Sequence, residues 1–155
     1  MNVTHQEWID QAIELAYENT KEKRGKPFGA IIVKDGEVIA KGVNDVLQTH
    51  DPTAHAELQA IRAAGQKLGT SDLSDCQLYA SGEPCPMCLG AIYLSNLKEV
   101  YYAYTAEEEA AAGLGTQYYY EQLALPKHQR DIQLQHVKTN AGDRDPFALW
   151  KKLGR

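Results

Sequence analysis

Two hydrophobic periodicities alternate along the chain, and each predicts a different kind of element. Between residues 8 and 16 apolar side chains recur every three or four positions, which predicts an amphipathic helix. The sequence T-x-x-E at residues 4–7 is a capping box that begins it, and the helix is expected to fade in the polar run at residues 19–26. Residues 28–34 and 38–44 are rich in β-formers and flank Asp35-Gly36, a two-residue sequence that favours a tight hairpin turn. The chain therefore begins with a helix and a β-hairpin.

The same alternation continues to the C-terminus. Further strands are predicted at residues 76–80, 99–104 and 132–139. Further helices are predicted to begin near Thr53, with Pro84 in a first turn, after a second capping box at residues 105–108, and at Asp145-Pro146. Strands that alternate with helices predict an α/β fold, a three-layer α/β/α sandwich with a central mixed sheet of about five strands. A chain of 155 residues is expected to form one domain, residues 1–155.

Two polar or aromatic runs do not fit the core pattern. The acidic and alanine-rich run at residues 107–112 is interpreted as an exposed helix face and not as a functional acidic patch. Tyr118, Tyr119 and Tyr120 are three consecutive tyrosines, typical of a strand or helix edge with one or two rings buried. The alternative is that they shape a binding pocket.

Composition narrows the classes of function. The net charge of −5 argues against a nucleic-acid partner, because phosphate binding requires a basic face. The N-terminus lacks the charged-then-apolar pattern of a secretory signal, and no apolar run is long enough to span a membrane. Three cysteines do not make a disulfide framework, so we expect a cytoplasmic protein without membrane contact.

Two short motifs carry candidate chemistry, His55-Ala56-Glu57 and Pro84-Cys85-Pro86-Met87-Cys88. At the start of a helix, cysteines three residues apart place both sulfurs on one face, and the helix N-terminus favours their thiolate forms. With His55 as a third ligand, Cys85 and Cys88 predict one zinc ion per chain. Three protein ligands leave a tetrahedral zinc one open position for water, whose pKa the metal lowers to about 7.

Glu57 lies two residues from the proposed ligand His55 and is the candidate catalytic residue, a proton shuttle between water and a leaving amine. A structural zinc site is the alternative, and it would need a fourth ligand, for which Cys76 and His50 are the nearest candidates. A thioredoxin-like redox pair would leave His55 and Glu57 unexplained. Together, H-x-E and P-C-x-x-C in this order form the pattern of zinc-dependent nucleobase deaminases.

The chain resembles the cytidine deaminase-like superfamily through PFGAIIVKDG at residues 27–36, DPTAHAE at 51–57 and EPCPMCLGAI at 83–92. This resemblance implies His55, Cys85 and Cys88 as zinc ligands and Glu57 as the proton shuttle. It also implies substrate contacts from the Asn44 amide, from Phe28 at the pocket wall and from Ala54 in the DPTAHAE segment. A strand-end turn role is the alternative for Asn44.

Within the superfamily, DPTAHAE, EPCPMCLGAIY and the C-terminal PFALW are similar to bacterial guanine deaminases, which implies conversion of guanine to xanthine. The chain departs from the pattern of those enzymes at one segment that bears on the substrate. They usually carry Phe-Asp-Asp, with an acidic residue that reaches the substrate, where this chain has Leu114-Gly115-Thr116. Guanosine, cytosine, cytidine and an aminotriazine are therefore alternative substrates, and a tRNA adenosine ranks below them. From a different class, the chain could be a non-catalytic zinc-binding module.

The same resemblance concerns assembly. Bacterial guanine deaminases are domain-swapped dimers whose C-terminal segment closes the partner's site, so the resemblance implies a homodimer with residues 140–155 as the exchanged lid. Phe147 and Trp150 would then contact the substrate. The alternative is that these two rings bury the apolar face of a terminal helix in their own chain.

Overall fold

The computed structural model describes residues 4–154 of the chain. The chain divides into two compact units after Gln122, and each unit is described by itself. The first contains the helices and strands α1 (His5–Lys21), β1 (Gly29–Lys34), β2 (Glu37–Val43), α2 (Val46–Thr49), α3 (Ala56–Leu68), β3 (Gln77–Gly82), α4 (Pro86–Leu94), β4 (Glu99–Tyr104) and α5 (Ala106–Ala111). Helix α6 (Gln117–Ala124) spans the boundary, and the second unit contains η1 (Lys127–Gln129), η2 (Gly142–Arg144) and α7 (Pro146–Leu153).

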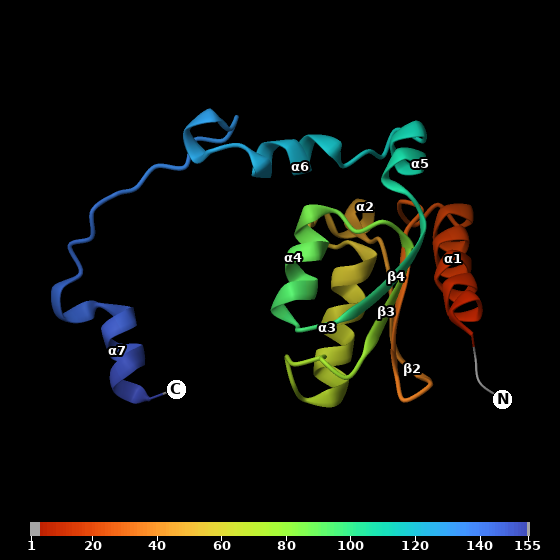
Figure 1. Ribbon diagram of the computed structural model, residues 1–155, viewed down its shortest axis with the longest axis horizontal. Helices are drawn as coiled ribbons and strands as arrows, with labels where there is room; N and C mark the ends of the chain where they lie inside the picture. Colours follow the sequence, from red (N-terminus) through yellow and green to blue (C-terminus); the bar gives the residue numbers. More distant parts are fainter. Residues whose placement is uncertain (1–3, 155) are drawn as a thin grey trace. The chain divides into compact units, whose positions relative to one another are not determined.

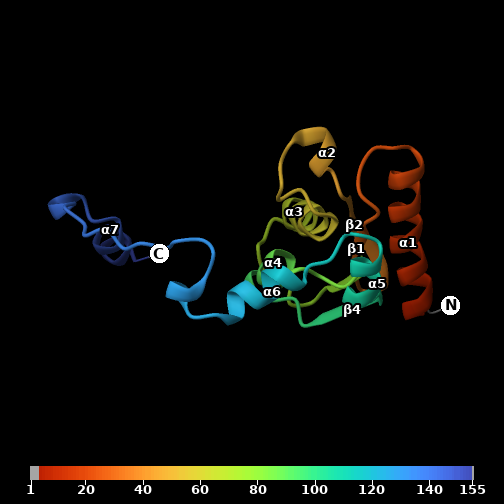
Figure 2. The same cartoon turned by 90° about the horizontal axis from the view of Figure 1, so that it is seen from above.

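The sheet is mixed and has the strand order β2-β1-β3-β4 in the described chain. Strand β1 is antiparallel to both of its neighbours, whereas β3 and β4 run parallel. Helix α1 packs on β1 and β3 from one side, and α3 packs on β1 and β2 from the other, with α4 beside it (Figure 1, Figure 2). The predicted three-layer α/β/α sandwich is confirmed.

Three local predictions are confirmed, one turn and two capping boxes. Asp35 and Gly36 both have positive φ, 51° and 75°, as the two-residue turn between β1 and β2 requires. Thr4 caps α1 through its side-chain oxygen, which accepts from the N–H of Glu7, while the Glu7 carboxylate accepts from the N–H of Thr4. Thr105 and Glu108 form the same reciprocal pair at the start of α5.

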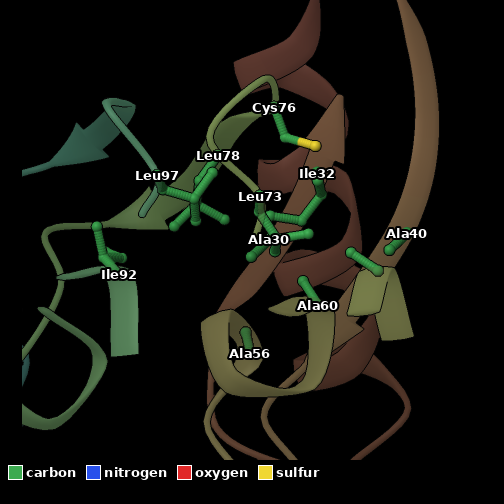
Figure 3. Close-up of a cluster of buried hydrophobic side chains, with 11 residues drawn as sticks. Ala30, Ile32, Ala40, Ala56, Ala60, Leu73, Cys76, Leu78, Ile92 and Leu97 are labelled. Carbon is green, nitrogen blue, oxygen red and sulfur yellow. The ribbon is translucent and has the colours of Figure 1, made fainter. Parts of the chain in front are cut away.

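The two faces of the sheet have separate cores. The first, drawn in Figure 3, lies between the sheet and α3 with α4, and it includes Ile32, Ala60, Leu78 and Ile92. Cys76 is buried in this core. The second core lies under α1, where Trp8 and Ile9 pack against inward residues of β1 and β3. None of the described helices combines the length and apolarity that crossing a membrane requires.

Three predictions of secondary structure were wrong. The described residues form a sheet of four strands, because residues 132–139 are exposed and pair with no described strand. Helix α3 begins at Ala56 and not near Thr53, since Thr53 bonds to the Asp51 carboxylate in a turn that precedes the helix. In α4 the proline at the first helical position is Pro86, and Pro84 lies before the helix.

The acidic run at residues 107–112 was also only partly interpreted correctly. Glu107 and Glu108 are exposed, as expected, but Glu109 is buried on the inner face of α5. The tyrosine run forms the first turns of α6, where Tyr118 and Tyr119 are exposed and Tyr120 is half-buried. Tyr120 donates its hydroxyl to the carbonyl of Pro84 at 2.6 Å, which ties the start of α6 to the segment before α4.

Candidate active site

Two helix N-termini bring the metal-binding side chains together. His55 is the N-cap residue of α3 and Cys85 is the N-cap residue of α4, while Cys88 lies in the first turn of α4. Both N-cap residues have extended backbone, so their side chains project past the ends of the helices. The partial positive charge at each N-terminus favours thiolate sulfur nearby.

The three side chains form a group that could hold a metal ion, with all ligand atoms within 4.8 Å of one another. Nδ1 of His55 lies 3.5 Å from Sγ of Cys85 and 3.6 Å from Sγ of Cys88. Tetrahedral zinc with Zn–S of about 2.3 Å and Zn–N of about 2.0–2.1 Å separates nitrogen and sulfur ligands by roughly 3.5–3.6 Å. The spacing and the donor types therefore fit zinc.

The thiols are electrostatically unequal. The pKa of the Cys85 thiol is lowered, because the Cys88 thiol and the His55 ring hydrogen-bond to it. The pKa of Cys88 is raised by its hydrogen bond to Cys85 and by burial. The hydrogen bond to Cys85 also raises the pKa of His55. Of the two thiols, Cys85 is therefore the one whose thiolate form its neighbours favour.

Neither candidate for a fourth ligand is part of the group that the described residues form. Cys76 lies in the core between the sheet and α3, and His50 is exposed at the end of α2. A closed structural site would require four protein ligands. Three ligands with one open position correspond to the catalytic arrangement.

Glu57 lies in the first turn of α3, and only 6% of its surface is exposed. Burial raises the pKa of its carboxyl group, because a charged carboxylate is poorly solvated there. A carboxyl group that holds a proton closer to neutral pH than usual suits a residue that must both take and return protons.

A cavity of about 200 Å³ adjoins the metal-binding group. Its lining includes the predicted site residues Asn44, Phe28, His55, Glu57 and Cys85. Asn44 is buried directly after β2, and its side-chain oxygen accepts from the N–H of Val46 at 3.2 Å. The strand-end turn role of Asn44 is therefore present, and its contact with the substrate stays a prediction that its place in the cavity allows.

Within the first unit, one other predicted contact, Ala54, does not line this cavity. Ala54 is buried, and its carbonyl accepts from the N–H of Asp45 at 2.9 Å, so it shapes the loop before His55. Phe147 and Trp150 lie on α7 in the second unit, and their contact with a substrate stays a prediction, as does the alternative in which they bury the apolar face of a terminal helix.

The sequence reasoning missed several residues that line the cavity. They include Lys26, Glu83 and Glu109, whereas Leu114-Gly115-Thr116 and Tyr119, which also line it, had been considered for the substrate pocket. The capping box at Thr105 fixes where α5 begins, but the side of α5 that faces the sheet depends on tertiary packing. No local signal therefore separates Glu109 from its exposed neighbours Glu107 and Glu108.

Comparison with known proteins identifies the family. The profile described as the cytidine and deoxycytidylate deaminase zinc-binding region matches residues 2–104. The chain belongs to this deaminase family. Zinc is accordingly the metal that the His55, Cys85 and Cys88 group fits, and the enzyme is a hydrolytic deaminase of the guanine deaminase-like type.

Full-length similarity to one relative is high. The deaminase is 44% identical to guanine deaminase of Bacillus subtilis (strain 168) over 151 residues, which cover 97% of this chain and 96% of that protein. The crystal structure of guanine deaminase from Bacillus subtilis matches with a TM-score of 0.92 at 43% identity, covering 97% of this chain and 95% of that one.

Two further relatives mark the range of the family. Guanine deaminase from Nitrosomonas europaea has a TM-score of 0.69 at 31% identity and covers 75% of this deaminase and 66% of its own chain. The tRNA-specific adenosine deaminase of Aquifex aeolicus (strain VF5) is 49% identical over 82 residues, which cover 53% of this chain and 54% of that protein. The similarity to the tRNA enzyme is thus confined to about half of each chain.

Proposed function

We propose that this deaminase hydrolyses guanine to xanthine and ammonia. The observation that carries the proposal is the position of buried Glu57 beside a three-ligand His-Cys-Cys group in one small cavity. The near full-length similarity to a guanine deaminase supports the choice of base. A cavity of about 200 Å³ is smaller than the roughly 300–1,000 Å³ of typical drug-sized sites, which favours a compact heterocycle.

His55, Cys85 and Cys88 would hold the zinc, and when bound it supplies a Lewis acid that lowers the pKa of water to about 7. Glu57 accepts a proton from the attacking water and delivers it to the ring nitrogen next to the amine-bearing carbon. Glu57 then passes the second proton to the departing amine, which leaves as ammonia. One water is consumed for each ammonia released.

Asn44 and Phe28 are proposed to position the base. The Asn44 amide is fixed at one end by the N–H of Val46, and its backbone N–H donates to the carbonyl of Phe28 at 3.1 Å. Asn19 further holds this corner, because its side-chain NH₂ donates to the carbonyls of Lys26 and Asn44, both at 2.9 Å. The two cavity residues are therefore linked through one rigid backbone corner.

We also propose that the protein acts as a homodimer, with Phe147 and Trp150 on residues 140–155 closing the site of a partner. The apolar side chains of α7, which also include Leu149 and Leu153, support an interface, since proteins rarely leave such groups of apolar residues uncovered.

We place the protein in the cytoplasm because its cysteines are free, and we expect neither membrane nor nucleic-acid partners.

Ammonia release by the zinc-loaded protein tests the substrate. The panel is guanine, guanosine, adenine, cytosine, cytidine, an aminotriazine and a tRNA anticodon stem-loop. We expect guanine to have the highest kcat/KM. Turnover of another compound with guanine inert would show that Leu114-Gly115-Thr116 marks a change of substrate, and turnover of the stem-loop alone would favour the tRNA branch. A zinc-loaded protein that releases no ammonia from any of them would contradict the proposal.

A further inference from the structure

Glu109 is a buried carboxylate with an unused acceptor. Its residue is 6% exposed, and its Oε1 atom has no hydrogen-bond partner within residues 4–154. Neither ion pair found in the described chain involves it, since those join Arg24 to Glu22 and Lys34 to Asp75. A buried polar oxygen without a partner costs stability, so its presence calls for a ligand or a chemical role.

The backbone holds Glu109 firmly in this position. Its N–H donates to the carbonyl of Thr105 at 3.0 Å, and its own carbonyl accepts from the N–H of Leu114 at 2.9 Å. Its carboxyl group packs directly over Gly82 at the end of β3, where a Cβ atom would lie 2.5 Å from Oε1. Glycine at position 82 is therefore what leaves room for the carboxylate.

The carboxylate of Glu109 belongs to the cavity that also contains His55, Glu57 and Asn44. Three acidic residues line that cavity, and the other two are engaged. Glu57 has the proton-shuttle role, and Glu83 accepts from the N–H of Ala106 at 3.3 Å. Glu109 is thus the acidic group in this lining that is left to meet a ligand.

Electrostatics agree with this assignment. Burial and the nearby Glu57 charge raise the pKa of Glu109 to about 7, against a partial opposing effect from the backbone N–H of Glu83. A ligand N–H would restore a partner to the charged form. The adjacent wall, Leu114-Gly115-Thr116, supplies no other carboxylate.

We propose that Glu109 is the substrate-recognition residue whose carboxylate accepts a hydrogen bond from a ring N–H beside the amine-bearing carbon of the base. The inference rests on the proposed deamination and adds its basis of selectivity. Guanine has such a donor at N1, next to the C2 that bears the amine. The base 2-aminopurine bears the same amine, but its N1 is an acceptor and would face the carboxylate unfavourably.

The experiment compares Glu109→Gln and Glu109→Ala with the wild type on guanine and 2-aminopurine. Loss of a hydrogen bond to a charged group lowers kcat/KM for guanine by about 10- to 100-fold. We expect kcat/KM for 2-aminopurine not to fall, so the ratio of kcat/KM for guanine to kcat/KM for 2-aminopurine becomes smaller. Glu107→Gln is the matched control, because Glu107 is an exposed acid two positions away on the same helix.

A second variant guards against a folding artefact. Gly82→Ala keeps the carboxylate but forces it out of place, and it is expected to reduce the same selectivity ratio. All variants are compared at matched zinc content and thermal stability. An unchanged ratio in Glu109→Gln, Glu109→Ala and Gly82→Ala would overturn the role of Glu109.

Binding without turnover separates this inference from the proposed reaction. Hypoxanthine has the N1–H but no amine at C2, and purine lacks both. We expect the wild type to bind hypoxanthine more tightly than purine and Glu109→Ala to lose that preference. If guanine is deaminated but the preference persists in the variant, Glu109 is wrongly assigned. If no base is deaminated, the proposed deamination is wrong. The preference for hypoxanthine over purine then still decides the role of Glu109.

Discussion

At the scale of single residues, Glu57 is the group on which the proposed chemistry depends. It lies two positions from His55 in the first turn of α3, and it is not one of the three residues in the metal-binding group. Glu57→Gln keeps the size of the side chain but cannot carry protons. We expect kcat to fall by about 10²-fold or more.

The control for Glu57→Gln is its zinc content, measured by metal analysis of the purified protein. Bound zinc at wild-type stoichiometry together with lost turnover is the expected result. Wild-type kcat in the variant would show that the proton shuttle is another group.

The raised pKa of Glu109 predicts that the free energy of unfolding depends on pH. Its folded-state pKa is raised to about 7 from a usual 4.5, so its stabilising contribution is complete below about pH 4.5 and is lost as the pH rises through 7. Glu109→Gln does not titrate. Relative to the wild type, its free energy of unfolding should rise between pH 5 and pH 8, by about 1–3 kcal/mol at roughly 1.4 kcal/mol per pKa unit.

Denaturant unfolding of both proteins at the two pH values measures this difference. Glu57, Glu83 and Cys85 also act on Glu109 and remain in both proteins, so the difference measures the titration of Glu109 together with its coupling to these groups. A difference that does not change with pH would mean that Glu109 has an ordinary pKa in the folded protein.

At the scale of elements, close packing of β2 on α3 sets the position of the site. A Cβ atom on Gly42 would lie 2.2 Å from the carbonyl oxygen of Ala56 and 2.6 Å from the nitrogen of Ala60. Gly42→Ala would therefore push α3 away and move Glu57 with it. We expect a loss of about 1–3 kcal/mol in the free energy of unfolding, accompanied by lower activity.

Gly90 provides the matched control on α4. A Cβ atom there meets nothing within 4 Å, and alanine is the better helix former, so Gly90→Ala should be neutral or stabilising by up to about 1 kcal/mol. Urea unfolding compares the two variants. Equal stability of Gly42→Ala and Gly90→Ala would contradict the close contact between β2 and α3.

Elements with local signals were predictable from the sequence. The Asp35-Gly36 turn and the capping boxes at Thr4 and Thr105 involve residues at most three positions apart, so a short window contains the whole interaction. The metal-binding group was also predictable in composition, because spacing on a helix start fixes where Cys85 and Cys88 can point. The roles of these site residues stay predictions.

Interactions that depend on distant partners were not predictable. Residues 132–139 alternate like a strand, but a strand exists only where another edge pairs with it, and no described strand does. Glu109 shares its composition with Glu107 and Glu108, and only the packing of α5 on the sheet distinguishes it. Pattern and periodicity contain neither the pairing partner nor the phase of a short helix.

At the scale of the whole molecule, the apolar residues that α7 carries predict a homodimer. For a chain of 17.2 kDa, sedimentation should give about 2 × 17.2 = 34.4 kDa. Phe147→Ala and Trp150→Ala should also lower kcat/KM if these rings cover a partner's site, while Val137→Ala, at a similarly exposed position, should not. A monomer at all concentrations would count against the dimer and against the exchanged lid.

The central claim is that the metal held by His55, Cys85 and Cys88 enables this deaminase to hydrolyse guanine. The most direct test follows ammonia and xanthine from guanine in one preparation, as purified, after chelation and after zinc is restored. We expect one ammonia per xanthine, loss of turnover with the metal and its recovery at about one zinc per chain. Undiminished turnover in protein shown to be free of zinc would contradict the account.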